Sequence, residues 1–125
     1  MKNNVGLWID HRMAVIVSFR DGVEEIKQII SGMEKHVRFS GRGQDVSGED
    51  QSDKKFTGHL HQYYDKVISS IRDADSILIL GPGEAKGEIK TRMESEALGG
   101  HIIGIETADK MTDRQIAAKV REYFS

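Results

Sequence analysis

The chain contains no cysteine, a single proline and few aromatic residues. The lack of cysteine excludes disulfides, cysteine-based zinc sites and thiol catalysis, and it fits a reducing compartment. No apolar run approaches the roughly 20 residues that a helix needs to cross a bilayer. The first residues, Met1–Asn4, lead into a short strand-like run rather than a signal-peptide apolar region. We therefore expect a soluble, cytoplasmic protein with no membrane association.

Neither sign of charge dominates the sequence. The 125 residues include 18 Lys and Arg and 20 Asp and Glu, which gives a formal net charge of −2. This balance does not indicate a nucleic-acid binder that is basic over its whole surface, although a local basic patch is compatible with it. The length suits one domain with a hydrophobic core, and no repeat divides the chain. We expect a single domain over residues 1–125.

Short apolar runs and helical periodicities alternate along the chain. The expected strands are Val5–Ile9, Ala14–Phe19, Val23–Ile30, Ile77–Leu80 and His101–Ile105. Three helices are expected. The first begins at Thr57, and the second spans Glu84–Leu98 and is ended by Gly99 and Gly100. The third follows a capping box at Thr112–Gln115. Asp21 and Gly22 give a hairpin turn between two of the strands.

Residues 32–56 differ in composition from their surroundings. They contain four glycines and many charged residues but few apolar ones. A loop of this length in a small domain is usually functional or disordered. We therefore expect a long flexible loop at about residues 32–56.

The resulting order, βββαβαβα, is that of the ribonuclease-H-like α/β fold, a mixed sheet flanked by helices. This fold raises the hypothesis of a two-metal, magnesium-dependent nuclease, because Asp10 ends the first strand and Glu106 ends the fifth. However, glycines 81 and 83 stand where a further acid is needed, and a polar turn explains Asp10 better. The histidines, at positions 11, 36, 59, 61 and 101, lack metal-ligand spacing. We expect no metal site and no cofactor.

The most informative segment is Ser76–Gly87. A buried strand runs into Gly81, Pro82 and Gly83, and a helix follows at once with Lys86 one turn in. This layout directs backbone N–H groups and a helix N-terminus to one place, where anions such as phosphates bind. It does not match the P-loop pattern. A purely structural role, with glycine for the turn and a solvated lysine, remains an equal alternative.

A second group of candidates lies in the expected loop. Glycines flank Arg42 on both sides and allow close approach to another molecule. The guanidinium groups of Arg38 and Arg42 suit phosphates. The alternative is a flexible, solvated loop, because acidic residues nearby largely cancel the positive charge.

The junction Gly81–Lys86, between a strand and a helix, resembles the central domain of Pelota and of the archaeal and eukaryotic class 1 peptide-chain release factors. This group is often called translational machinery components. Release factors of this class carry a Gly-Gly-Gln loop between the third strand and the first long helix, and this chain has Gly41–Gln44 in the same interval. The resemblance covers nearly the whole order of elements. It suggests a stand-alone, bacterial-type relative of the central domain.

In the release factors the glutamine loop promotes hydrolysis of peptidyl-tRNA on the ribosome. The resemblance implies that Gln44 would position the attacking water and that Gly43 would supply backbone freedom. Arg42 replaces the first glycine of the triplet, and a side chain there could block the required backbone conformation. Pelota-like domains lack the triplet and do not hydrolyse the ester, so the fold does not imply the reaction.

We expect a translation-associated domain that binds ribosomal RNA or tRNA and is not an enzyme. The expected anion and RNA contacts are Gly81, Gly83, Lys86, Arg38 and Arg42. One alternative is peptidyl-tRNA hydrolysis through Gly43 and Gln44. A different alternative is a protein-interaction module or homo-oligomer without a role in RNA binding.

Overall fold

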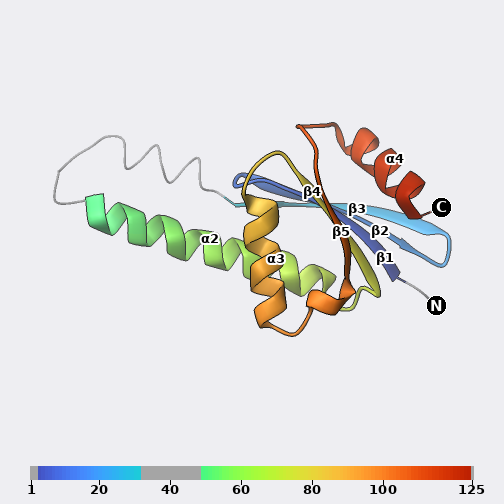
Figure 1. Ribbon diagram of the computed structural model, residues 1–125. Coiled ribbons are helices and arrows are strands. Elements are labelled where there is room, and N and C mark those ends of the chain that lie inside the picture. The colour runs from blue at the N-terminus through green and yellow to red at the C-terminus, as the bar shows by residue number, and fades with distance from the viewer. Residues whose placement is uncertain (1–2, 32–48, 125) are drawn as a thin grey trace.

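A five-stranded mixed sheet with helices on both faces forms the body of the molecule (Figure 1). The computed structural model describes residues 3–31 and 49–124, and only the backbone of residues 49–57. The strands are β1 (Asn3–Ile9), β2 (Met13–Arg20), β3 (Val23–Ile30), β4 (Ser76–Gly81) and β5 (Ile102–Thr107). The helices are α2 (Glu49–Ile71), α3 (Ala85–Ser95) and α4 (Asp113–Phe124), with a 3₁₀ turn η2 (Gly99–His101). The predicted ribonuclease-H-like α/β order is confirmed.

The sheet has the spatial order β3-β2-β1-β4-β5. β1, β2 and β3 form an antiparallel meander, while β4 pairs in parallel with both β1 and β5. The β2–β3 turn uses Asp21 and Gly22, both with positive φ (55° and 79°), which suits a tight hairpin connection. β1 and β4 thus lie side by side in the middle of the sheet, with their carboxyl ends at the same edge.

The core has two layers because the central strands are covered on both faces. Alternate residues of β1 and β4, such as Leu7 and Ile79, pack under α2 and α3. Their neighbours, such as Trp8 and Leu80, pack under α4. Figure 1 shows α2 and α3 on one side of the sheet and α4 on the other. The continuous apolar run of β4 is buried throughout, as expected for a strand covered on both faces.

The approach of α4 to the sheet depends on a glycine in β1. A Cβ atom placed on Gly6 would collide with the side chain of Val120 in α4. The helix therefore lies closer to β1 at this point than any larger residue would allow. The predicted capping box at the start of α4 is confirmed. Gln115 N–H donates to Thr112 Oγ1 (3.2 Å), and Thr112 N–H donates to Gln115 Oε1 (2.9 Å).

The first long helix begins earlier than predicted. α2 starts at Glu49 rather than at Thr57, so the expectation of a loop is wrong for residues 49–56. This stretch has no apolar periodicity in its sequence, which is why it resembled a loop. Figure 1 shows that the first turns of α2 extend beyond the sheet, where a helix needs no apolar face.

The end of α3 also differs from the prediction. The helix ends at Ser95, not at Leu98 before the two glycines. Ala97 adopts a left-handed conformation (φ 63°), Ala97 N–H donates to Glu94 O (3.1 Å), and Leu98 N–H donates to Met93 O (2.8 Å). These two bonds form a Schellman cap, with Leu98 packed on the core cluster that contains Met93. Ala97, two residues beyond the end of the helix, is exposed.

Within residues 3–31 and 49–124, no helix combines the length and the apolar character that crossing a bilayer demands.

Candidate functional site

The candidate site lies at the carboxyl edge of the two central parallel strands. Asp10 and His11 follow β1, and the Gly81–Glu84 junction links β4 to the first turn of α3. Gly81 is buried, and a Cβ on it would collide with the backbone oxygen of Ile9 in β1. Its carbonyl oxygen accepts a hydrogen bond from Ala108 N–H (2.9 Å), beyond the end of β5. Gly81 is therefore required for the close contact between adjacent strand ends.

The predicted anion contacts of the junction surround the start of α3. Pro82 and Gly83 are exposed, and Lys86 is half-buried. Lys86 Nζ donates a hydrogen bond to Gly83 O (2.6 Å), so its side chain folds back over the junction. This contact agrees with the structural alternative, in which Lys86 stabilises the turn. It also holds the ammonium group close to the start of the helix.

The first turn of α3 leaves backbone donors available. In the part of the chain that the structure describes, the N–H groups of Ala85 and Lys86 have no protein acceptor. A groove of about 510 Å³ runs beside this turn, and its lining includes Gly83 and Lys86. Glu84 and Glu88 also line the groove. Backbone dipoles therefore favour an anion here, while the two carboxylates oppose it.

Asp10 has a structural role. Its Oδ1 atom accepts hydrogen bonds from Arg12 N–H and Met13 N–H (2.8 Å each), which is a turn stabilised by its own side chain. Glu106 lies in β5, separated from β1 by β4, and pairs with Lys119 (3.6 Å). Among the residues that the structure describes, no three His, Asp or Glu side chains are arranged to hold a metal ion. The arrangement thus favours the polar turn over the nuclease site.

A polar cluster that the sequence did not predict joins β1, α2 and α3. Glu88 Oε1 accepts hydrogen bonds from Tyr64 Oη (2.6 Å) and from His11 Nε2 (3.0 Å). The neighbouring Tyr63 Oη donates to Asp10 O (3.0 Å). The two tyrosine rings are buried, whereas His11 and Glu88 are partly exposed. The cluster lies at the same carboxyl edge as the junction, next to the start of α3.

The environment of this cluster lowers the pKa of the Glu88 carboxyl and raises the pKa values of the two tyrosine hydroxyls. Burial, by itself, would raise the pKa of Glu88, but the hydrogen bonds from Tyr64 and His11 outweigh it and lower the pKa below its usual 4.5. Burial raises the pKa of Tyr63 above the ordinary range, and the charge of Asp10 adds to the effect. Burial, followed by the hydrogen bond to Glu88, raises the pKa of Tyr64. The tyrosines are therefore neutral donors and Glu88 is an ionised acceptor at neutral pH.

A second groove, of about 540 Å³, lies between α2 and α3, and Glu88 is part of its lining. Its lining includes Leu60, His61, Tyr64 and Arg92. Tyr64 lies at helical spacing from Leu60 and Val67, and this pattern alone indicates only that it faces the core. No spacing could have linked it to Glu88 or His11, because the contacts join separate elements.

The other predicted site residues, Arg38, Arg42, Gly43 and Gln44, lie outside the described residues. Their relation to the junction stays a prediction.

Comparisons with known proteins show a likeness of structure. No family model and no curated protein matches the chain. The Pelota protein of Thermoplasma acidophilum matches 97% of this chain with a TM-score of 0.58 and 16% identity, and Archaeoglobus fulgidus Pelota matches 96% with 0.57 and 12%. The archaeal translation termination factor aRF1 matches 98% with 0.54 and 12%. This chain spans 38%, 31% and 39% of those three chains, respectively.

At these low identities, the TM-scores above 0.5 show a common fold and no more. The expected resemblance is therefore confirmed at that level, and the chain is a domain with the ribonuclease-H-like fold of Pelota and the archaeal termination factor aRF1.

Proposed function

We propose that this chain acts in translation and binds ribosomal RNA or tRNA. The observation that carries the proposal is the structural match over 96–98% of the chain to two Pelota proteins and a translation termination factor. Such a role would place the protein in the cytoplasm, on or near ribosomes.

The proposed contact surface is the β4–α3 junction at Gly83 and Lys86, joined by Arg38 and Arg42. Gly81, also predicted as a contact, is buried and supports the junction from within. Two features of the junction support it. The N–H groups of Ala85 and Lys86 have no acceptor among the described residues, and a groove lies beside them. An RNA phosphate would replace Gly83 O as the acceptor for Lys86 Nζ. The carboxylates of Glu84 and Glu88 would favour one or two phosphate contacts over a broad basic surface.

The test is binding of the full chain to purified ribosomes and to tRNA over a range of salt concentrations. The variant Lys86→Glu/Arg42→Glu should bind more weakly than the wild type and with a smaller salt dependence, because phosphate contacts are lost. The double variant Arg20→Glu/Arg72→Glu is the matched control. It has the same change in charge, but both residues lie at the opposite end of the central strands from the junction. They form surface ion pairs with Asp73 and Glu96.

The control should bind as the wild type does. If the wild type binds neither ribosomes nor tRNA, the proposed function is wrong. If both double variants lose the same affinity, the effect comes from overall charge and the junction is not the contact surface.

Peptidyl-tRNA hydrolysis is the alternative activity, and its support is the sequence Gly43-Gln44. It predicts that the wild type releases peptide from stalled ribosomes and that Gln44→Ala does not. No release by the wild type, or equal release by both proteins, would exclude it.

A further inference from the structure

β3 forms one edge of the sheet (Figure 1). It pairs with β2 along its whole length, from Val23 opposite Arg20 to Ile30 opposite Met13, without a register shift. On its other side, no strand from residues 3–31 or 49–124 pairs with it. β3 contains no proline or glycine that would discourage pairing. A regular, unpaired edge of this kind presents backbone donors and acceptors to another strand.

The face of β3 toward α4 has an apolar spot at its centre. Glu24 pairs with Arg121 (2.8 Å), and Gln28 Nε2 donates to Asp113 Oδ2 (2.8 Å), so both contact α4. Ile26, between them on the same face, is 42% exposed. Ile30, at the end of the strand on this face, is 63% exposed, and Val23, at the other end on the opposite face, is 57% exposed. Apolar side chains along an edge strand gain burial when a second strand pairs with it.

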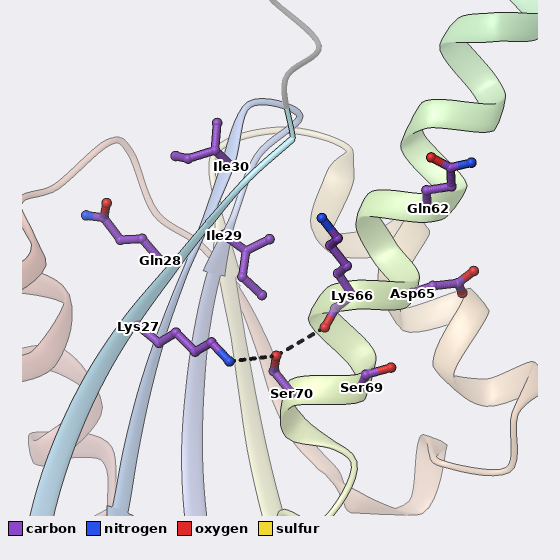
Figure 2. Close-up of a pocket in the computed structure, with 9 residues that line it drawn as sticks. All are labelled: Lys27, Gln28, Ile29, Ile30, Gln62, Asp65, Lys66, Ser69 and Ser70. Carbon is purple, nitrogen blue, oxygen red and sulfur yellow. Dashed lines mark hydrogen bonds between the residues drawn. The ribbon is translucent and has the colours of Figure 1, made fainter.

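The face toward α2 has two opposite charges without an ionic partner. Glu25 and Lys27 lie two residues apart on this face and are exposed. Neither forms an ion pair with a residue that the structure describes. Lys27 Nζ lies 3.4 Å from Ser70 Oγ, at the wall of a groove of about 620 Å³ between β3 and α2 (Figure 2). Both charges can therefore accept a partner from outside.

We propose that two copies of this chain pair antiparallel through β3, about a two-fold axis at Ile26. An axis perpendicular to the sheet keeps the α2 face of one copy beside the α2 face of the other. Ile26 then lies opposite Ile26 of the second copy, and Glu25 lies opposite Lys27 in both directions. Val23 lies opposite Ile29. One strand sequence thus supplies an apolar contact and two ion pairs to itself.

Other registers fit less well. An axis at Glu25 or at Lys27 would set that residue against its own copy and oppose like charges. An axis at Gln28 would set Lys27 opposite Ile29 and Glu25 opposite Ser31, which leaves both charges without a partner. The charge pattern of β3 therefore selects both a second copy as the occupant and the register at Ile26.

The experiment is sedimentation equilibrium of the full chain up to millimolar concentration, with charge variants of β3. Glu25→Lys and Lys27→Glu each replace two attractive contacts of the dimer by two repulsive ones. Each should raise the dissociation constant about tenfold or more. The double variant Glu25→Lys/Lys27→Glu restores opposite charges and should return to the wild-type dissociation constant.

Mixing the two single variants gives the sharpest readout. Positions 25 and 27 are both positive in the Glu25→Lys variant and both negative in the Lys27→Glu variant. Opposite charges would therefore face each other in the mixture, and heterodimers should form where neither variant dimerises alone. An effect of net charge would change the two single variants in opposite directions, whereas β3 pairing weakens both. Circular dichroism verifies that each variant is folded.

A wild type that stays monomeric at millimolar concentration would overturn the proposal. So would a dimer that is unaffected by the single substitutions, or single variants that do not associate when mixed.

Discussion

Tyr64 Oη, on α2, donates a 2.6 Å hydrogen bond to Glu88 Oε1 in the first turn of α3. His11, just after β1, donates to the same oxygen atom. One carboxylate oxygen thus joins two helices and the end of a central strand. Because the contact joins these three elements, it fixes the position of α3 relative to the sheet. It lies beside the junction that we propose as an RNA contact.

Tyr64→Phe should lower the free energy of unfolding by about 1 kcal/mol, since a buried hydroxyl loses a charged acceptor that is itself partly exposed to solvent. The phenyl ring keeps its place in the core. Urea unfolding at neutral pH measures the change. The matched control is Tyr123→Phe, because Tyr123 is exposed and its hydroxyl makes only a 3.4 Å contact with Ile103 O. Equal losses in the two variants would contradict a specific role for the Tyr64–Glu88 bond.

The lowered pKa of Glu88 makes part of the stability dependent on pH. The folded-state pKa lies below the usual value of 4.5, so the unfolded state binds a proton more readily. The contribution of Glu88 is fully present above pH 4.5 and is lost as the pH falls through the folded-state pKa. In urea unfolding over a pH series, the free energy of unfolding should fall less at acid pH for Glu88→Gln than for the wild type. Parallel curves would show that Glu88 does not contribute.

Ala97→Gly should stabilise the protein by about 0.5–1 kcal/mol, because Ala97 has a φ of 63° that glycine adopts without a Cβ clash. Greater freedom of glycine in the unfolded chain limits the gain. Thermal unfolding measures the effect. Ala118→Gly is the control: Ala118 is exposed within α4, and the same substitution there should destabilise by about 1 kcal/mol. The two substitutions should therefore change the free energy of unfolding in opposite directions, and changes in the same direction would contradict the prediction.

Gly6→Ala should destabilise by about 1–3 kcal/mol, since the added methyl group would overlap Val120 and push α4 from the sheet. Val120→Ala should reduce the cost of Gly6→Ala, which a double-mutant cycle would measure as a coupling energy. Gly87→Ala is the control, as a Cβ at this helical position meets no other atom. It should be neutral or stabilising. Additive effects of Gly6→Ala and Val120→Ala would contradict the contact.

Local patterns predicted most of the elements. The apolar run Ala14–Phe19, the turn signal at Asp21 and Gly22, and the continuous apolar run Ile77–Leu80 identified strands. The capping box Thr112–Gln115 identified the start of α4. The predicted helix boundaries were wrong where a local signal was absent or was overridden by packing. The start of α2 has no apolar pattern, and α3 ends at Ser95, before the glycines, because Ala97 turns the chain and Leu98 packs on the core.

The sequence by itself determined the order of strands and helices, because apolar periodicity and capping depend on neighbouring residues. It also identified the junction at Gly81–Lys86, since two glycines between a buried strand and a helix are a local signal. Tertiary structure alone decided which side chains meet there. His11 and Glu88 are 77 positions apart, and Tyr64 and Glu88 are 24 apart. Those contacts depend on how the sheet orders its strands and how the helices cross it, which no spacing within one element can specify.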